Sequence, residues 1–292
     1  MDHVVIIGNG ISGVTAARHI RKLSPKRITI ISSETDFFFS RTALMYVYMG
    51  HMRFKDTQPY EASFWKKNNI SLKKAYVKDI DFASKTLSLD TEEDYTYDHL
   101  ILAVGSVPNK FGWTGQDLAG VQGLYHYQDL ERLNYATQRG IKRGVIIGGG
   151  LIGVELAEML HSKDIDVSFL VRESSFWNKV LPTQESEMIT REIQKNGIDL
   201  RLGTELREII GDNEGQVSKI ITTTGEEIAC EFVGLTAGVS PNIQFLKNTE
   251  LATARGILVN QFLECNQEDV YAIGDCAEFE EAIEGRRKIE QV

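Results

Sequence analysis

The chain has 292 residues, of which 42% are hydrophobic and 25% charged, and its formal net charge is −9. This length accommodates about two globular domains, and the composition is that of ordinary globular proteins. The acidic balance argues against a nucleic-acid-binding surface, because phosphate binding requires clustered lysine and arginine. No apolar run approaches the roughly 20 residues of a membrane-spanning helix, and the N-terminal residues lack a signal-peptide pattern.

The cysteines and histidines give no sign of a metal or redox centre. The three cysteines form no C-x-x-C pair, and the six histidines share no metal-ligand spacing. Neither a redox dithiol nor a zinc site is therefore expected. This cysteine usage fits a reducing compartment, and a cytoplasmic location is expected.

The first element is a short apolar run, Val4–Ile7, which predicts a central parallel strand. The glycine turn GNGISG follows at Gly8–Gly13, then a helical stretch to about Lys22 and a second apolar strand at 27–31. This strand–turn–helix–strand order is the context in which the pattern G-x-G-x-x-G binds a dinucleotide.

Residues between the first strands and the middle of the chain are less regular. Residues 42–69 are rich in aromatic side chains and are predicted to be largely helical. The loose alternation of residues 71–94 predicts antiparallel strands and a crossover, and residues 200–229 repeat this pattern.

The order of the first elements recurs between residues 144 and 171, around a second glycine turn, Gly148–Gly153. A further pair of segments matches, LAVGSVPN at 102–109 and LTAGVSPN at 235–242. Each predicts an apolar strand that ends in a glycine turn fixed by Pro-Asn. The repetition predicts two similar dinucleotide-binding domains.

Each glycine in such a turn has its own role. The first permits the tight turn, the second lets a phosphate approach the backbone, and the third lets the helix pack on the strand. The helix N-terminus then binds the pyrophosphate. The predicted cofactor-binding residues of the two turns are Gly8, Asn9, Gly10, Ile11, Ser12, Gly13, Gly148, Gly150, Leu151, Ile152 and Gly153.

A carboxylate at the end of each second strand would bind a ribose hydroxyl. In the first unit the candidate is Glu34, with Asp36 as the alternative. In the second unit Arg172 stands at this place and would suit the 2′-phosphate of NADPH, whereas Glu173 takes the acid's role if the register differs by one residue. The residues favour NADPH slightly and leave NADH open.

A third feature is VYAIGDCAEF at 270–279, where an apolar strand runs into Gly274 and Asp275. This places a carboxylate at the C-terminal end of a strand, where α/β proteins bind ligands. Taken together, five ordered motifs resemble the FAD- and NAD(P)H-dependent pyridine nucleotide oxidoreductase family. The motifs are GNGISG at 8–13, YDHLILAVGSVPN at 97–109, GGGLIGVELAE at 148–158, LTAGVSPN at 235–242 and VYAIGDCA at 270–277.

The resemblance implies an α/β fold with two Rossmann-like domains, in which the NAD(P)-binding domain is inserted within the FAD-binding domain. The FAD-binding domain is expected at residues 1–115 and 246–292, and the NAD(P)H-binding domain at 116–245. The implied cofactors are FAD at the first glycine turn and NAD(P)H at the second. The family's FAD domain continues beyond the Gly-Asp motif, so the resemblance implies a C-terminally truncated chain.

The resemblance also assigns roles to single residues. Asp275, after Gly274, matches an aspartate that binds the ribityl or phosphate part of FAD, and Arg41 matches an arginine that approaches FAD. Glu155 matches a glutamate near the flavin and nicotinamide, and is the catalytic candidate, expected to orient the nicotinamide. Further cofactor contacts are expected at Ala103, Gly105 and Gly238.

The absence of cysteine in FFFSRTALMY, residues 37–46, favours one branch of the family. Disulfide reductases and peroxidase-type members carry cysteine in this region, and the segment looks closer to the rubredoxin, ferredoxin and nitrite reductase-like branch. The implied activity is hydride transfer from NAD(P)H to FAD and electron transfer to a separate acceptor, such as a redox protein or quinone. A nucleotide-binding module with little or no turnover and a single-nucleotide enzyme are the alternatives. A homodimer and the acceptor's identity stay open.

Overall fold

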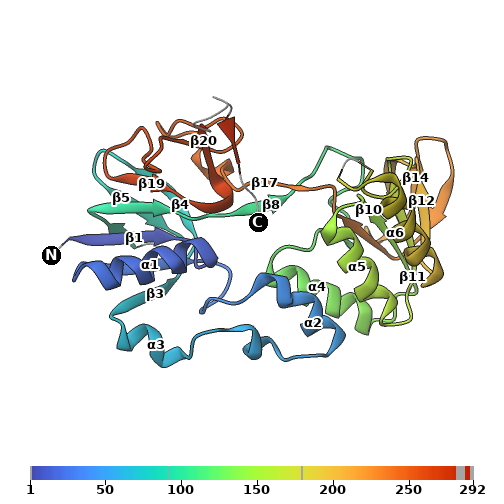
Figure 1. The fold of residues 1–292 in the computed structure, drawn as a ribbon, viewed down its shortest axis with the longest axis horizontal. Helices are drawn as coiled ribbons and strands as arrows, with labels where there is room; N and C mark the ends of the chain where they lie inside the picture. Colours follow the sequence, from blue (N-terminus) through green and yellow to red (C-terminus); the bar gives the residue numbers. More distant parts are fainter. Residues whose placement is uncertain (1, 92, 179, 281–286, 290–292) are drawn as a thin grey trace. The chain divides into compact units, whose positions relative to one another are not determined.

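The computed structural model describes residues 2–91, 93–178, 180–280 and 287–289. The chain divides into two compact units, and the second is inserted within the first (Figure 1). The first unit comprises Met1–Ser40, Phe54–Val107 and Ser240–Val292. The second comprises Arg41–Arg53 and Pro108–Val239.

A parallel sheet with the strand order β19-β7-β1-β2-β3 forms the centre of the first unit. Helix α1 (Ile11–Leu23) follows β1 and packs against β1 and β2 (Figure 1). The chain turns back across β1 to reach β7, so the strand order reverses between these two strands. The strands are β1 (His3–Ile7), β2 (Arg27–Ser32), β3 (Ile70–Lys74), β7 (His99–Leu102) and β19 (Val270–Ala272).

The sequence of β1 explains its central position. All five of its residues are buried, as expected for a β-branched run in a parallel sheet covered on both faces. Val5 and Ile7 pack into one apolar cluster, and Val4 and Ile6 pack into another with Val14 of α1. The alternation of successive side chains between two cores fixes the register of the strand.

Smaller elements complete the first unit. The antiparallel strands predicted within residues 71–94 are present as β4, β5 and β6, but β3 pairs in parallel with β2 instead. These elements are β4 (Val77–Asp81), β5 (Thr86–Leu89), β6 (Asp94–Thr96), β18 (Ile257–Val259), β20 (Ala277–Glu280), β21 (Arg287–Lys288), α3 (Ala62–Lys67) and the short 3₁₀ helices η2 (Phe54–Thr57), η3 (Gln244–Leu246) and η4 (Gly274–Cys276).

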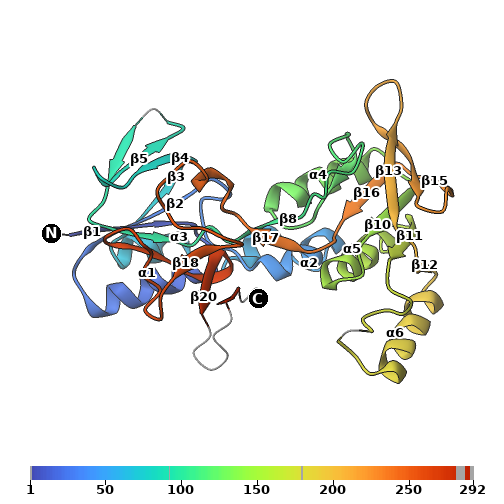
Figure 2. The same cartoon turned by 90° about the horizontal axis from the view of Figure 1, so that it is seen from above.

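The second unit repeats the plan, with a parallel sheet in the order β12-β11-β10-β16-β9. Helix α5 (Leu151–His161) follows β10 and packs against β10, β11 and β16. An antiparallel sheet, β13-β14-β15, accompanies it (Figure 2). The strands are β9 (Val121–Gln122), β10 (Arg143–Ile147), β11 (Asp166–Val171), β12 (Asp199–Leu202), β13 (Leu206–Gly211), β14 (Val217–Thr222), β15 (Glu227–Ala229) and β16 (Phe232–Leu235).

The predicted helical region 42–69 is largely helical but is shared between the units. Helix α2 (Leu44–Met49), preceded by η1 (Arg41–Ala43), packs on α4 (Tyr127–Gln138) and α5, whereas α3 belongs to the first unit. The hydroxyl groups of Tyr48 and Thr137 lie 2.7 Å apart and connect α2 to α4.

Two helices and a strand pair were not predicted. The sequence did not predict helix α4 or the polar helix α6 (Thr183–Lys195). Helix α6 lies beside β12 (Figure 2). Strands β8 (Ser106–Pro108) and β17 (Val239–Pro241) form a two-stranded sheet. The predicted fold class, an α/β protein with two Rossmann-like units, is confirmed by the two parallel sheets.

Candidate nucleotide-binding sites

The glycine turn of the first unit shows the division of roles expected for its three glycines. Gly8 has a φ of +112°, and a β-carbon there would lie 2.1 Å from the carbonyl oxygen of Ala103. A β-carbon at Gly13 would lie 2.1 Å from the carbonyl oxygen of Gly8. No heavy atom lies within 4 Å of a β-carbon built on Gly10. Gly8 and Gly13 therefore permit internal packing, whereas Gly10 leaves the backbone open to a ligand.

The side chain of Asn9 connects this turn to the end of β2 through hydrogen bonds. Its buried side-chain amide donates to the carbonyl oxygen of Thr35 at 2.9 Å, and the hydroxyl of Ser32 donates to its amide oxygen at 3.0 Å. The glycine turn and the end of the second strand are thus held together by a buried hydrogen-bonded side chain. Asn9 was predicted to contact the cofactor, but the sequence did not predict that its side chain anchors the turn.

The same strand end carries the two candidate ribose-binding carboxylates. Glu34 is half-buried, and its backbone N–H donates to the hydroxyl of Ser32 at 3.3 Å. Asp36 is exposed, and its carboxylate lies 3.7 Å from Nζ of Lys74. The position of Glu34 next to the anchored segment favours it over Asp36.

The turn after β19 lies against the first glycine turn. Gly274 has a φ of +71°, and a β-carbon there would lie 2.3 Å from the hydroxyl oxygen of Ser12. The adjacent Asp275 accepts a hydrogen bond from the hydroxyl of the buried Ser106 at 3.4 Å. The structure thus brings together the predicted residues Ser12, Gly274 and Asp275. It also shows that Ser106, which was not predicted, contacts Asp275. The motif VGSVPN contained Ser106, but the fold is needed to show its contact across the sheet.

These contacts gather at the carboxyl ends of parallel strands, where the strand order reverses between β1 and β7. The backbone N–H of Ala103 donates to the carbonyl oxygen of Ile7 at 2.8 Å, and Gly105 follows with a φ of +64°. Open α/β sheets bind ligands at this kind of reversal. The open backbone at Gly10 and the N-terminus of α1 fit the pyrophosphate of a dinucleotide, such as the ADP part of FAD.

The glycine turn of the second unit has the same geometry. Gly148 has a φ of +113°, and a β-carbon there would lie 2.7 Å from the carbonyl oxygen of Thr236. A β-carbon at Gly153 would lie 2.3 Å from the carbonyl oxygen of Gly148, whereas at Gly150 the nearest atom is 3.8 Å away. Two glycines again permit packing and the middle one, Gly150, is not crowded by any atom, so this turn also fits a pyrophosphate at the N-terminus of α5.

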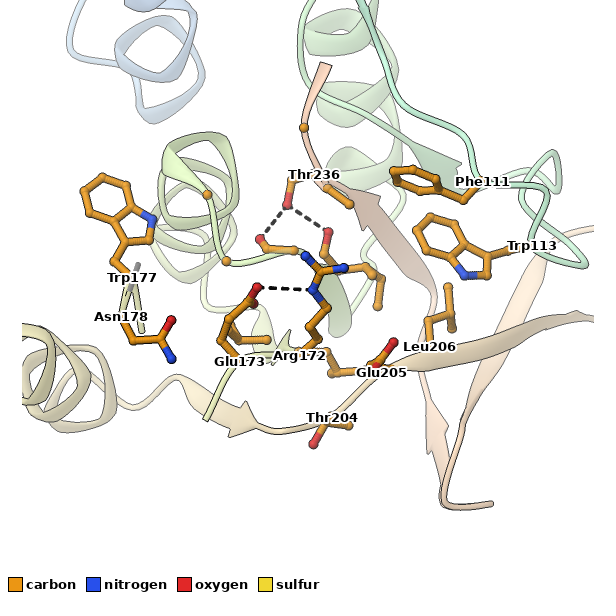
Figure 3. A pocket seen from close by; sticks show the side chains of 18 of the residues that line it. Phe111, Trp113, Arg172, Glu173, Trp177, Asn178, Thr204, Glu205, Leu206 and Thr236 are labelled. Atoms are coloured by element: carbon orange, nitrogen blue, oxygen red, sulfur yellow. Dashed lines mark hydrogen bonds and ion pairs between the residues drawn. The ribbon is translucent and has the colours of Figure 1, made fainter. Parts of the chain in front are cut away.

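A pocket of about 440 Å³ lies over this turn (Figure 3). Its walls include the glycines at 148–150, the chain that follows β11, and the segment Thr236–Gly238 after β16. Phe111 and Trp113 close one side, with ring centroids 5.1 Å apart in an edge-to-face arrangement. Gly238, a predicted contact, thus belongs to the pocket, and its carbonyl oxygen accepts from the backbone N–H of Asn109 at 3.0 Å.

Arg172 and Glu173 both line this pocket and form an ion pair within it (Figure 3). Nε of Arg172 donates to Oε1 of Glu173 at 3.1 Å. The Arg172 side chain is 66% exposed and that of Glu173 is 24% exposed. Both groups that the sequence offered for the adenosine ribose are therefore present in one pocket.

Other predicted residues of the second unit lie outside the described lining of the pocket. Leu151 and Ile152 form the first turn of α5, with Leu151 exposed. Glu155 is half-buried on the same helix, and burial raises the pKa of its carboxyl group, with a further increase from the charge of Glu158. Its carboxyl group therefore stays protonated to higher pH than that of an exposed glutamate.

Arg41 lies in the second unit and contacts Tyr125. Its guanidinium donates to the carbonyl oxygen of Tyr125 and lies 4.5 Å from the centroid of that ring. Its predicted contact with FAD stays a prediction.

The described residues also bear on metal binding and membrane insertion. Within that part of the chain no group of three or more histidine, cysteine, aspartate and glutamate side chains could hold a metal ion. No helix among the same residues is long and apolar enough to cross a membrane.

Two Rossmann-like units, each with a dinucleotide-type glycine turn at a helix N-terminus, define a class of protein that binds two nucleotides. The family model described as pyridine nucleotide-disulphide oxidoreductase matches residues 2–292, and the chain belongs to this family. The match confirms the resemblance seen in the sequence, and with it the class of FAD- and pyridine nucleotide-dependent enzymes.

Individual relatives agree with the predicted branch. The chain is 30% identical over 279 residues to nitrite reductase [NAD(P)H] of Bacillus subtilis, and 31% identical over 290 residues to rubredoxin-NAD(+) reductase of Acinetobacter baylyi. These alignments cover 94% and 95% of this chain but 34% and 72% of the two relatives. A ferredoxin reductase structure from Rhodopseudomonas palustris superimposes with a TM-score of 0.91 at 26% identity, covering 100% of this chain and 72% of that one.

Proposed function

We propose that the chain is an NAD(P)H-dependent flavoprotein oxidoreductase that passes electrons to a separate redox protein. The first unit holds FAD and the second holds NAD(P)H. The observation that carries this proposal is the repetition of one turn geometry, in which a β-carbon on Gly10 or Gly150 would meet no atom closer than 3.8 Å at the N-terminus of the helix. The relatives named for rubredoxin and ferredoxin reduction support the acceptor class.

In the first unit the N–H groups at the start of α1 bind the pyrophosphate of FAD, because the helix N-terminus carries partial positive charge. Glu34 accepts a hydrogen bond from a ribose hydroxyl, and Asn9 keeps that segment in place. Asp275, held by Ser106, binds the ribityl or phosphate part.

In the second unit the start of α5 binds the pyrophosphate of NAD(P)H, and the pocket beside β11 receives the adenosine part. Glu155, half-buried on α5 with the pKa of its carboxyl raised by burial, orients the nicotinamide. When bound, the flavin supplies the ability to accept a hydride and release single electrons, so the protein's task is binding and alignment.

The proposal assigns the cysteines no part in electron transfer. Burial raises the pKa of Cys230 and Cys265 to about 12, and that of Cys276 to about 11. Thiols with such pKa values carry almost no thiolate near neutral pH and are poor nucleophiles for thiol–disulfide exchange. The proposal includes a cytoplasmic location, and a homodimer is compatible with it.

The test is an absorbance titration of the full chain with FAD, followed by anaerobic addition of NADH or NADPH. We expect a bound flavin spectrum that bleaches with at least one nucleotide, and reoxidation on adding oxidised rubredoxin. The variant Gly150→Val should keep flavin binding and lose bleaching. Bound flavin that neither nucleotide bleaches would favour the alternative, a binding module with little turnover. Absence of flavin binding would contradict the assignment of the first unit.

A further inference from the structure

The first residue after β16, Thr236, has a buried side chain that is hydrogen-bonded to the second glycine turn. It is 5% exposed, and its hydroxyl lies 3.0 Å from each of the carbonyl oxygens of Ile147 and Gly148 (Figure 3). A hydroxyl has one hydrogen to donate, so the two carbonyl oxygens share it. The first turn of α5 also packs closely here, because a β-carbon at Gly153 would lie 2.9 Å from the Thr236 hydroxyl oxygen. Thr236 therefore connects the end of β16 to the end of β10 and to the first residue of the turn.

The first unit forms a similar glycine turn without such a hydroxyl. The matching segments LAVGSVPN and LTAGVSPN place Ala103 where the second unit has Thr236. The backbone N–H of each residue donates to a carbonyl oxygen at the end of β1 or β10, at 2.8 Å in both units. The turns also begin alike, with a φ of +112° at Gly8 and +113° at Gly148. A turn of this shape therefore forms without the hydroxyl, so the hydroxyl of Thr236 is not required for the fold of the turn.

The Thr236 hydroxyl sets the direction of one peptide group in the turn. The carbonyl oxygen of Gly148 belongs to the peptide that joins Gly148 to Gly149. In a planar trans peptide the carbonyl oxygen and the N–H point in opposite directions. Because the hydroxyl holds the Gly148 oxygen, the N–H of Gly149 points away from Thr236. Gly148 and Gly149 both line the pocket, so this peptide group forms part of the wall that a ligand meets.

The peptide group between Gly148 and Gly149 has no side chain to fix its direction. Glycine adopts positive and negative φ about equally well, so this peptide can turn over at little cost. Turned over, it would present its carbonyl oxygen to a ligand in the pocket instead of its N–H. An anion is attracted by the partial positive charge of an N–H and repelled by the partial negative charge of a carbonyl oxygen. The direction of this peptide group therefore affects how strongly the turn binds an anion.

We propose that Thr236 is a positioning residue for the pyrophosphate of the nucleotide that the second unit binds. Its hydroxyl keeps the Gly148 oxygen turned away from the ligand and the Gly149 N–H turned toward it. The hydroxyl acts through the peptide group, without a contact of its own to the ligand. This inference rests on the proposed function, because it assumes that the second unit binds a dinucleotide at this turn.

The test compares adenosine with ADP, which differs from it only in the diphosphate, by ligand-detected NMR titration of the flavin-loaded full chain. Flavin occupies the first unit, so the titration reports on the second. Thr236→Val keeps the shape of the side chain and removes the hydroxyl. We expect it to weaken ADP by about tenfold or more, the effect of losing a hydrogen bond to a charged group, and to change adenosine by less than about twofold. Thr236→Ser retains the hydroxyl and should bind ADP within about threefold of wild type.

Two controls separate positioning from a general loss of structure. Thr222 is also buried in the second unit, with its hydroxyl 2.9 Å from that of Thr224, and it lies outside the described lining of the pocket. Thr222→Val should leave ADP affinity unchanged, whatever its effect on stability. Urea unfolding checks that each variant is folded. If Thr236→Val does not fold, Thr236→Ala also removes the hydroxyl and should show the same selective loss of ADP affinity.

The outcomes distinguish this inference from the proposed function. If ADP does not bind the flavin-loaded wild-type chain, the second nucleotide site is wrong and both proposals fail. If ADP binds the wild type and the folded variant without the hydroxyl equally well, only the role of Thr236 is overturned. Equal weakening of adenosine and ADP, or a loss in Thr236→Ser as large as in Thr236→Val, would also overturn the positioning role and leave the proposed function in place.

Discussion

The backbone of Gly8 lies so close to Ala103 that a β-carbon at Gly8 would approach the Ala103 carbonyl oxygen to 2.1 Å. Gly8 also has a φ of +112°, which side chains rarely adopt. We expect Gly8→Ala to lower the free energy of unfolding by about 2–4 kcal/mol, the range of a backbone clash combined with a strained φ. Urea unfolding of the chain without added FAD measures this loss.

Gly10→Ala is the matched control, because a β-carbon there meets no heavy atom within 4 Å and φ is −70°. Its free energy of unfolding should stay within about 0.5 kcal/mol of wild type. FAD affinity should nevertheless fall, since the methyl group occupies the space through which a phosphate reaches the backbone. Wild-type FAD affinity in Gly10→Ala would show that the phosphate binds elsewhere.

The elements around these glycine turns could be predicted from the sequence, whereas the contacts between distant segments could not. Short-range patterns identified β1, α1 and α5 closely, because apolar runs and glycine spacing are local signals. The contact between Ser106 and Asp275 joins residues 169 positions apart in the chain, and no local pattern reports it.

Other elements escaped prediction for physical reasons. Helix α6 is largely polar, and its buried side chains are Ser186 and Ile193, so it contains no apolar run that would mark it in the sequence. Strand β3 lies at the sheet edge with only Ile70 fully buried, and its alternation resembled that of the antiparallel strands that follow it. The placement of α2 in the second unit depends on contacts such as Tyr48 with Thr137, which the sequence does not reveal.

His3 should make the stability of the first unit depend on pH. Its ring is buried, with Nε2 2.9 Å from the hydroxyl of Thr29 and Nδ1 3.1 Å from the carbonyl oxygen of Thr96. Burial lowers the pKa of His3, and the charge of Arg27 lowers it further. The unfolded chain therefore binds a proton first, and stability is lost as the pH falls from about 6.5 toward the lower folded-state pKa.

Urea unfolding between pH 8 and pH 5 tests this expectation. His3→Gln should flatten the pH dependence, although the variant is less stable overall. His19 is exposed on α1, so His19→Gln should retain the wild-type slope. Equal slopes in wild type, His3→Gln and His19→Gln would show that the pKa of His3 is the same in the folded and unfolded chain.

Asp129 should be important for the stability of the second unit. Its carboxylate is buried and accepts hydrogen bonds from the backbone N–H groups of Tyr125 and His126, each at 2.8 Å, at the start of α4. Asp129→Ala should cost about 2–4 kcal/mol, because two partly buried N–H groups lose their acceptor and Arg132 loses its ion pair. Asp117, exposed and paired with Lys110, is the control, and Asp117→Ala should cost less than about 0.5 kcal/mol. Similar losses in both variants would contradict this account.

The thiols should be unreactive in the folded protein. Cys230 and Cys276 are buried and Cys265 is partly buried, and all three have pKa values of about 11 or about 12. At pH 8 a disulfide reagent should therefore label no thiol rapidly, and all three after unfolding. Cys265→Ser should leave flavin reduction by NAD(P)H unchanged. A rapidly labelled thiol whose blocking stops reduction would restore a role for cysteine in the electron path.

Glu155 should impose a pH dependence on flavin reduction by NAD(P)H. Burial raises the pKa of its carboxyl group, so the protonated form persists to higher pH than for an exposed glutamate. Stopped-flow reduction rates of wild type should fall as the pH rises through this pKa, and Glu155→Gln should remove the transition while leaving nucleotide affinity within about threefold. Glu158 is exposed and contributes to the upward shift, so Glu158→Gln should move the transition to lower pH without abolishing it. A transition that survives in Glu155→Gln would assign the titration to another group and remove the evidence that Glu155 orients the nicotinamide.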